Sequence, residues 1–389
     1  MSHRLIPVAT RLPSTGILPL APGLPNRLGG CLRLHGGGSK LRAGQFVVFL
    51  LSLSLGGCAS IKTGLFRAAM TIAGDDVYTS RFIALKNPKF ISAEEASYLA
   101  PNEEVIGICF NGVAKAYPLT MSFHHHIFND EIGDKKVLVT FCPLTHTAIA
   151  FDPVIAHCDP VTFTVGGLKE SNMTMINGST GAPWVQLTGR AVKDDRPDTR
   201  LDVLFALHTT WQLWKELHPN TLVLSRDTGF HLDYSQFPFQ KKYFKYKESP
   251  KLFFSVSHSD SRYHPKEMIL GVEVDGVCKA YPFTALAGKS VVNDSVRRLP
   301  IVVLYDAASQ SVAGFSRVLD GQCLSFAAAV EGAVMRIRDS TTRSAWNIEG
   351  MAYEGPYAGS RLTPLRSFKA FWFAWVTFHP ETLVYTGDD

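Results

Sequence analysis

The sequence predicts a β-rich α+β fold built from two tandem, similar lobes. The main observation is an internal repeat, because residues 105–118 and 269–282 align without gaps at an offset of 164 residues. Further matches keep the same order to the end of the chain, and they include an Asn-Asp pair, three tryptophans and a His-Pro pair in each copy. So many ordered matches indicate an internal duplication, in which each copy forms one similar unit.

Strand signals dominate each copy. Asn111-Gly112 and Asp275-Gly276 each interrupt an apolar run, and such pairs favour the type I′ turn of a β-hairpin. The Tyr-Pro that follows ends the second strand, because proline cannot donate a hydrogen bond to a ladder. The patterns predict further strands at 136–142, 146–152, 161–166, 173–177 and 221–225, and an amphipathic helix near 208–218.

The positive charge of the chain lies at its N-terminus. The 389 residues carry a formal net charge of +5, from 39 basic and 34 acidic residues. Residues 1–57 hold six of the basic residues and no acidic one, so the remainder has 33 basic against 34 acidic residues. A nucleic-acid partner therefore has no compositional support, because such a partner needs the basic surplus on the folded part.

The N-terminal segment has the pattern of an export signal. Lys40 and Arg42 precede a short apolar run at 46–55, and Gly56-Gly57-Cys58 follows it. The run is too short for an ordinary membrane span. Leu55-Gly56-Gly57-Cys58 resembles the lipobox of bacterial lipoproteins, which implies a lipid on Cys58 and removal of the preceding residues. Since Ala59 is not the Asp associated with inner-membrane retention, the resemblance favours the periplasmic face of the outer membrane. An uncleaved anchor or a buried strand is the alternative.

These patterns divide the chain into five parts. They are an export segment at 1–57, whose first 39 residues fit a start codon placed too far upstream, a tether at 58–80, a first repeat lobe at 81–225, a linker at 226–262, and a second, degenerate lobe at 263–389. The linker is rich in lysine and aromatic residues, and it could contact an anionic polymer or form a solvated surface.

Five cysteines follow Cys58, and their number is odd. At least one thiol is therefore unpaired within the chain, even where the compartment permits disulfides. No CxxC pair is present, which argues against a structural zinc site and a thioredoxin-type motif. The sequence also lacks GxGxxG, GxxxxGK[ST] and GxSxG patterns, so it supports neither nucleotide binding nor a serine hydrolase.

The two copies differ where reactive side chains gather. The first copy has Cys142 and His146 in a segment where the second has Asp306 and Gln310. It also has three consecutive histidines at 124–126, where the second copy has Gly-Lys-Ser. If the shared residues build the fold, these unshared residues are the better candidates for function.

The region from about residue 100 to the C-terminus resembles the exported bacterial and archaeal proteins of domain-of-unknown-function family 3179. The residues that carry the resemblance include 116–119, 125–130, 139–145, 148–152 and 165–168, together with Ser171-Asn172, Trp184, Gly189 and the Trp-rich helix that ends at His218-Pro219. In that family His126 is usually Glu, Thr145 is often a second Cys, and Gly is common at position 146. The resemblance implies a fold and a site location, but no reaction.

Cys142 has two interpretations. It is a nucleophile or a soft metal ligand if a neighbouring histidine such as His146 lowers its pKa. It is otherwise a small buried residue at a strand end. Pro143 forces a turn there, and turns at strand ends expose side chains. We therefore take Cys142 and His146 as candidate catalytic residues.

The histidine run suggests a metal site. His125 and His126 with Cys142 suit a soft or borderline ion such as copper or zinc. A cluster of exposed loop histidines is the alternative. Asn129 and Asp130 recur in the second copy, which favours a structural turn, although Asp130 could orient a ligating histidine.

The sequence thus predicts an exported lipoprotein, anchored in the cell envelope through Cys58, whose first lobe binds a metal ion or small ligand around Cys142 and His125. Two alternatives remain open. One is a thiol-dependent enzyme with Cys142 as nucleophile. The other is a non-catalytic envelope scaffold that binds a partner protein through its duplicated lobes.

Overall fold

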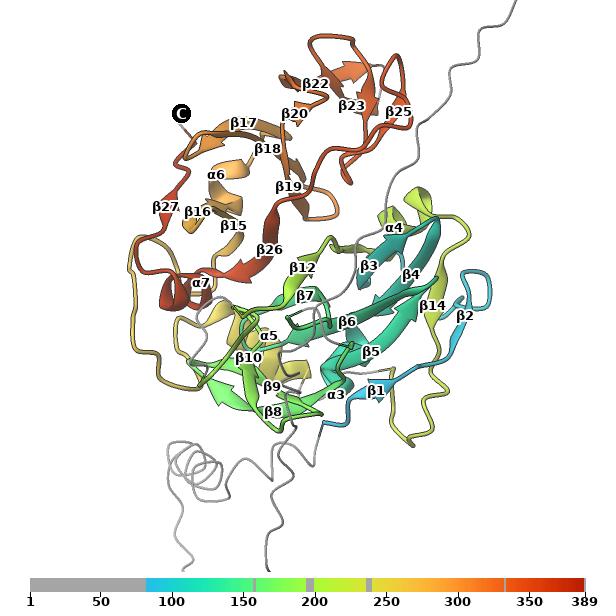
Figure 1. Cartoon of the computed structure of the whole chain (residues 1–389), viewed down its shortest axis with the longest axis vertical. Coiled ribbons are helices and arrows are strands. Elements are labelled where there is room, and N and C mark those ends of the chain that lie inside the picture. Colours follow the sequence, from blue (N-terminus) through green and yellow to red (C-terminus); the bar gives the residue numbers. More distant parts are fainter. Residues whose placement is uncertain (1–81, 157–158, 194–198, 236–239, 332–333, 388–389) are drawn as a thin grey trace, which may run out of the picture. The chain divides into compact units, whose positions relative to one another are not determined.

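The computed structural model describes residues 82–387 apart from 157–158, 194–198, 236–239 and 332–333 (Figure 1). The predicted export segment, the tether and Cys58 lie outside the described residues. Within the described part of the chain, no helix is long and apolar enough to cross a membrane.

Strands make up most of the described secondary structure, which confirms the β-rich α+β class. The helices are short: α3 (Leu119–His125), α4 (Trp211–Leu217), α5 (Gln240–Glu248), α6 (Phe283–Leu286) and α7 (Trp372–Phe378).

The first half of the described chain forms three sheets. Their strand orders are β13-β3-β4-β14-β2, β1-β5-β6-β7-β12 and β11-β10-β9-β8. The strands are β1 (Leu85–Lys86), β2 (Phe90–Ser92), β3 (Glu104–Phe110), β4 (Val113–Pro118), β5 (Ile127–Ile132), β6 (Lys135–Cys142), β7 (Thr147–Asp152), β8 (Phe163–Lys169), β9 (Asn172–Asn177), β10 (Pro183–Val185), β11 (Arg190–Ala191), β12 (Asp202–Leu204), β13 (Leu207–Thr210) and β14 (Leu222–Leu224).

The second half forms sheets of similar order. They are β26-β15-β16-β27, β17-β18-β19, β20-β21 and β22-β23-β24-β25. The strands are β15 (Met268–Val274), β16 (Val277–Pro282), β17 (Val291–Val296), β18 (Leu299–Asp306), β19 (Ser311–Ser316), β20 (Val318–Leu319), β21 (Gln322–Cys323), β22 (Phe326–Glu331), β23 (Val334–Asp339), β24 (Ala345–Trp346), β25 (Ala352–Glu354), β26 (Arg366–Phe371) and β27 (Leu383–Val384).

The predicted hairpins are confirmed in both halves. Strands β3 and β4 pair antiparallel, as do β15 and β16. Asn111 and Gly112 have φ of 49° and 79°, and Asp275 and Gly276 have φ of 47° and 78°. Positive φ at both central residues is what a type I′ turn requires.

Matching Asn-Asp pairs hold neighbouring strands together, although the sequence favoured a turn for them. Asn129 on β5 accepts from the Phe163 backbone N–H and donates back to its carbonyl. Asn293 on β17 does the same with Phe326. Amide side chains fit this role because they carry both a donor and an acceptor. The pairs therefore lie within strands, and they bridge to a second sheet.

Each half also packs a tryptophan of its C-terminal helix onto a strand glycine. A Cβ on Gly107 would lie 2.2 Å from the Trp214 ring, and one on Gly271 would lie 2.3 Å from the Trp375 ring. The indole N–H groups donate to Thr221 and to Thr382, respectively. The absence of a Cβ is what allows the ring to lie flat on the strand.

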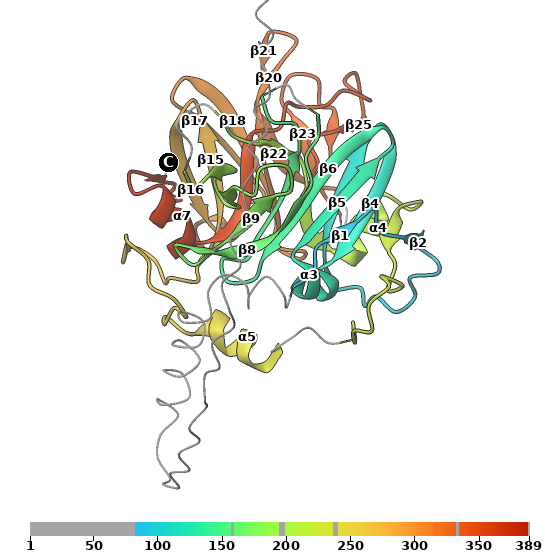
Figure 2. The same cartoon turned by 60° about the horizontal axis from the view of Figure 1, so that its bottom comes forward.

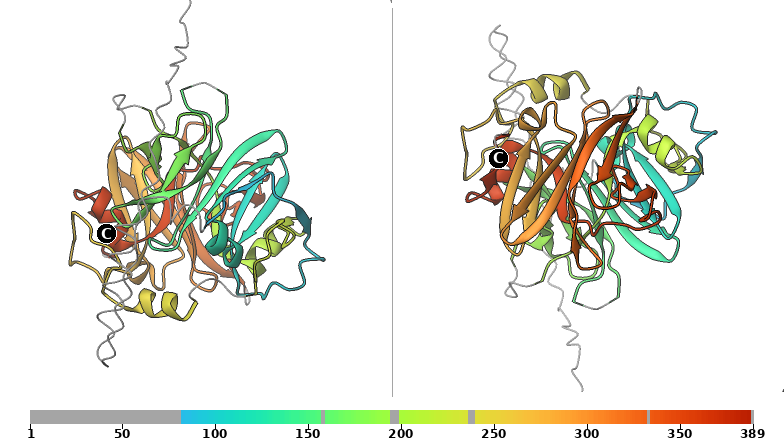
Figure 3. Two further views of the ribbon diagram at one scale, coloured as in Figure 1. Left: turned by 90° about the horizontal axis from the view of Figure 1, so that it is seen from below. Right: turned by 90° about the horizontal axis from the view of Figure 1, so that it is seen from above.

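Strands of the two halves pack against each other. Strand β13 of the first half lies beside β19 of the second, and β26 of the second lies beside β7 of the first. Ser311 donates to Thr209 at 2.6 Å, and the Phe371 N–H donates to the Thr145 carbonyl at 3.0 Å. Figure 3 shows the orange and red strands of the second half beside the cyan and green strands of the first. Side chains from both halves therefore meet at the contact between them.

The predicted linker contains a helix. Helix α5 lies at the same end of the molecule as α3 in Figure 2. Its Tyr243 packs on Phe123 of α3 with the ring centroids 4.7 Å apart, and Tyr246 donates to the Leu144 carbonyl at 2.8 Å. Tyr243 and Tyr246 are buried. Part of this segment thus covers the turn that follows β6.

A candidate metal centre of two histidines and a glutamate

Three side chains from the first half converge at the end of the β13–β3 pair. Glu104 begins β3 opposite Thr210, and His208 lies two residues earlier on β13, so both side chains point to the same face. His146 ends the turn between β6 and β7 with φ of 53°. Gln310 has φ of 51° at the matching turn. Glycine adopts this left-handed conformation without strain, whereas other residues do so less readily.

The ligand atoms of this Glu–His–His cluster are close together. Glu104 Oε2 lies 2.7 Å from His208 Nε2 and 3.3 Å from His146 Nε2. The two imidazole rings have centroids 5.1 Å apart. One ligand atom from each of the three residues lies within 4.8 Å of the other two. Both histidines are buried, whereas the Glu104 side chain is 38% exposed and forms the open side.

Burial keeps both imidazoles neutral. It lowers the pKa of His146, and together with nearby Lys369 it lowers the pKa of His208 to about 3. Burial alone would raise the pKa of Glu104, but its contacts with the two histidines hold that pKa well below the ordinary value. The cluster thus offers two neutral imidazoles and one carboxylate, the protonation states that a metal requires of its ligands.

The ring of His146 is oriented by its neighbours. Its Nδ1 lies 2.6 Å from the Tyr243 hydroxyl, which leaves Nε2 facing Glu104. Below the turn, buried side chains form a hydrogen-bonded network of Thr145, Thr147, Asn172 and Gln186. Such outer contacts fix the orientation of ligating histidines in metal sites.

The ring nitrogens of His208 are the ones in this cluster with the poorest hydrogen bonding. Among the described residues, neither of its buried ring nitrogens has a well-aligned hydrogen bond, although Nε2 is close to Glu104. Buried nitrogens without partners are uncommon and call for an explanation, such as an ion. Two imidazole nitrogens with one carboxylate form the His₂Glu set of catalytic zinc sites and the facial set of non-haem iron.

Cys142 does not join this cluster. It ends β6 and is 1% exposed, and the Met173 N–H donates to its sulfur at 3.4 Å. Burial raises the pKa of the Cys142 thiol, the opposite of what an activated nucleophile or a thiolate ligand needs. Of the two sequence interpretations, the geometry favours a small buried residue.

The structure does not bring His125 and His126 to Cys142 either. His125 Nδ1 lies 2.7 Å from the Ile83 carbonyl and its Nε2 lies 2.6 Å from the Tyr234 hydroxyl, so both nitrogens are engaged. His126 packs on Phe82 with the ring centroids 4.2 Å apart. Burial lowers the pKa of His125 to about 4 and that of His126 to about 3.

Asn129 and Asp130 make hydrogen bonds that connect neighbouring strands. Asn129 bonds the Phe163 backbone, and Asp130 accepts from Lys115 at 2.9 Å and from the Tyr117 hydroxyl at 2.6 Å. The contacts made by Asp130 therefore neutralise a buried lysine.

The sequence named His146 as a candidate catalytic residue, but it did not single out Glu104 or His208. The signal was present, because the repeat aligns Glu104 with Met268 and His208 with Lys369. Both positions thus carry a ligand type in the first copy and none in the second. The comparison of copies was applied only around residues 124–126 and 141–148, so it overlooked two ligands more than 100 residues apart.

The sequence of this chain matches a protein family whose function is unknown. The family described as protein of unknown function (DUF3179) matches residues 82–382, and the chain belongs to it. Comparisons with curated proteins and with solved structures gave no match.

Proposed function

We propose that this protein binds one divalent transition-metal ion through Glu104, His146 and His208. The observation that carries the proposal is the convergence of two neutral, buried imidazoles on one carboxylate, with one ligand atom from each residue within 4.8 Å of the other two. The donor set contains nitrogen and oxygen but no thiolate, so zinc and iron(II) fit it better than copper(I). The open side at Glu104 would admit water or a small ligand.

The proposal includes the location inferred from the sequence. The chain would be exported, lipidated at Cys58 and tethered to the cell envelope by residues 58–80. The support is the basic, apolar and small-residue pattern before Cys58. Replacing Cys58 with Ser is expected to move the protein from the membrane to the soluble fraction. Unchanged fractionation would contradict the anchor while leaving the metal site untouched.

The proposal also includes the internal duplication. The paired hairpins, Asn-Asp contacts and Gly–Trp contacts support a shared ancestor for the two halves. The second half would then have kept the scaffold and lost the ligands.

Metal analysis of the purified protein tests the site. We expect about one equivalent of zinc or iron in the wild type, and little in His146→Ala and His208→Ala. His125→Ala is a matched control, because it removes another buried histidine from the same half. Wild-type protein without stoichiometric metal after incubation with Zn²⁺ or Fe²⁺ would refute the proposal, as would equal loss in the control.

Tyr243→Phe tests how much the contact that orients His146 contributes to metal affinity. It removes only the hydroxyl next to His146 Nδ1. We expect metal affinity to fall by roughly 10–100-fold, the range for losing an outer contact of a ligand. Loss of His146 itself should cost more. Competition with a chromophoric chelator measures both affinities.

A further inference from the structure

A cavity of about 260 Å³ lies where the two halves meet. Arg190 and Arg200 line it from the first half, and Glu273, Arg366 and His379 line it from the second. The described residues that line the cavity include none of the three proposed metal ligands. Its volume is close to the lower end of the range for ligand pockets, about 300 Å³. The cavity is therefore a separate site with room for a small molecule.

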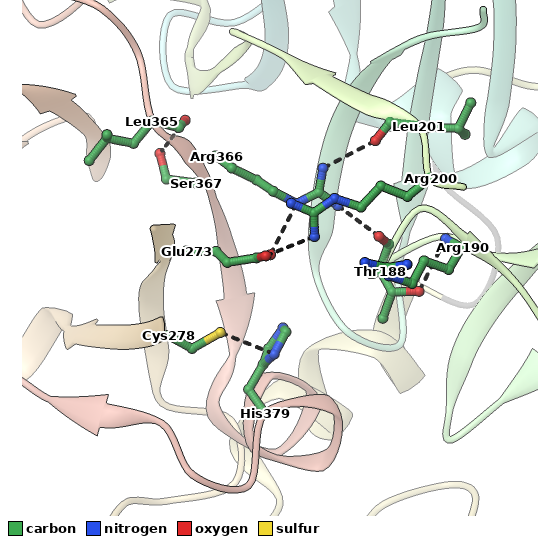
Figure 4. Close-up of polar contacts among 10 residues, drawn as sticks. All are labelled: Thr188, Arg190, Arg200, Leu201, Glu273, Cys278, Leu365, Arg366, Ser367 and His379. Atoms are coloured by element: carbon green, nitrogen blue, oxygen red, sulfur yellow. Dashed lines mark hydrogen bonds and ion pairs between the residues drawn. The ribbon is translucent and has the colours of Figure 1, made fainter. Parts of the chain in front are cut away.

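Three arginines give the lining of this cavity a surplus of positive charge. Arg190 and Arg200 pair across an antiparallel β-bridge, so their side chains leave the backbone on the same face. Glu273 accepts from Arg200 at 2.7 Å and pairs with Arg366 at 3.2 Å, as Figure 4 shows. Among the described residues that line the cavity, Glu273 is the only carboxylate. The lining thus carries three positive charges against one negative charge.

Two of these arginines have different surroundings. Arg366 donates to the Leu201 carbonyl at 3.2 Å and to the Thr188 carbonyl at 2.7 Å, and its Nε faces Glu273. All three of its side-chain nitrogens are therefore engaged within the protein. The Arg200 side chain is 29% exposed, whereas the Arg366 side chain is 13% exposed. Arg200 thus presents its guanidinium group to the cavity, and Arg366 supplies a fixed charge behind it.

The pKa values of two lining groups reflect this positive charge. The pKa of Arg366 is lowered to about 10, first by burial and then by the other two arginines of the cavity. The carboxylates of Glu273 and Asp202 offset only part of this effect. Burial lowers the pKa of His379 to about 4, and two of the guanidinium groups add to the shift. At neutral pH the arginines are therefore charged and His379 is neutral.

The rest of the lining is largely apolar. It includes three aromatic rings together with an aliphatic side chain and a thiol: Phe368, Trp375, Phe378, Leu187 and Cys278. The thiol of Cys278 is neutral, because burial raises its pKa to about 11. Ligand pockets typically combine such apolar walls with a few polar groups that fix the orientation of the ligand. This cavity therefore suits a molecule with one anionic end and one apolar end.

We propose that this cavity binds a small organic phosphate monoester, with its phosphate on Arg190 and Arg200 and its apolar group against the aromatic rings. Guanidinium groups bind phosphate oxygens through pairs of parallel hydrogen bonds. The surplus of two positive charges in the lining favours a dianion, such as a phosphate monoester, over a monocarboxylate. Glu273 offsets part of the repulsion among the guanidinium groups, because it contacts two of them.

Titration calorimetry with phenyl phosphate tests the cavity, at about pH 7.5, where a phosphate monoester carries close to two charges. We expect phenyl phosphate to bind more tightly than benzoate, which has one charge, than inorganic phosphate, which lacks the ring, and than phenol, which lacks the charge. Arg200→Gln should weaken phenyl phosphate binding by about tenfold or more, the factor for losing one hydrogen bond to a charged group. Absence of phenyl phosphate binding, or equal affinity for phenol, would overturn the proposal.

Arg336→Gln is the matched control for Arg200→Gln. Arg336 pairs with Glu354 at 2.9 Å and its side chain is 33% exposed, but it does not line the cavity. We expect Arg336→Gln to bind phenyl phosphate with the wild-type affinity. Unchanged affinity in Arg200→Gln, or equal loss in the two variants, would overturn the proposal, because binding would then lie elsewhere. If Arg200→Gln fails to fold, the ranking of the four compounds on the wild type still decides the proposal.

Discussion

The histidines that follow α4 and α7 occupy matching places in the two halves, but their pKa values are shifted in opposite directions, to about 9 for His218 and to about 4 for His379. Each packs on a tryptophan at 4.2 Å. One difference between the two halves is the group that the nearby carboxylate contacts. Glu349 bonds His218, whereas Glu273 bonds Arg200 and Arg366. Burial is the largest cause of the lowered pKa of His379. Glu273 opposes this shift, and repulsion by Arg366 and Arg200 adds to it.

A similar contrast separates the three proposed metal ligands from their counterparts in the second half. Glu104, His146 and His208 align with Met268, Gln310 and Lys369. The backbone at the turn is the same, since His146 and Gln310 both have positive φ. Lys369 itself lies near the cluster and affects the pKa of His208, so the second half contributes charge where the first contributes ligands.

Replacing Glu273 or Glu349 is expected to give the largest difference in the free energy of unfolding between the two halves. Glu273→Gln removes the carboxylate that pairs with Arg200 and Arg366, and guanidinium groups cannot lose their protons. We expect a loss of about 3 kcal/mol in the free energy of unfolding, at the low end for breaking a buried ion pair. Glu349→Gln leaves a histidine that can become neutral, so its cost should be about 1 kcal/mol. Urea denaturation at pH 7 measures both, and equal losses would break the comparison.

The scaffold itself should respond equally in the two halves. Gly107→Ala and Gly271→Ala each place a Cβ within 2.4 Å of a buried indole ring. Overpacking of this kind costs about 1–3 kcal/mol. Because the two environments match, we expect the two losses to agree within about 0.5 kcal/mol. Thermal or urea unfolding of the two variants checks this, and a large inequality would mean that the Gly–Trp contacts are not equivalent.

Local patterns in the sequence predicted much of this fold. Asn111-Gly112 and Asp275-Gly276 gave the hairpins correctly, because a turn with two positive φ angles is decided by two adjacent residues. The pattern also placed a helix near 208–218, and the structure has α4 at Trp211–Leu217. It did not predict β5 or β13. Strand β5 forms a hairpin with β6, which directly follows it, whereas β13 is stabilised by pairing with β3, a strand distant in the sequence.

The candidate site was harder to predict than the fold. His146 was found because its neighbours differ visibly between the copies. Glu104 and His208 are separated by about 100 residues and meet only through the pairing of β3 with β13. His218 and Glu349, which contact each other, lie in different halves, and these halves pack together in a way that the sequence pattern does not reveal. A site built across strands and halves depends on register and packing, and these are not local properties of the sequence.

The pH dependence of stability gives the finest test of the two histidines. The pKa of His218 in the folded protein is about 9, above its ordinary value of 6.5, so its stabilising effect is complete below pH 6.5 and is lost as the pH rises through 9. The pKa of His379 is about 4, so its effect is present above pH 6.5 and is lost as the pH falls through 4. Relative to wild type, His218→Gln should therefore recover stability from pH 6.5 to 9, whereas His379→Gln should recover it from pH 6.5 to 4. Urea denaturation at pH 4.5, 6.5 and 9 measures the two slopes. If both variants shift in the same direction, the surroundings of these two histidines do not move their pKa values in opposite directions.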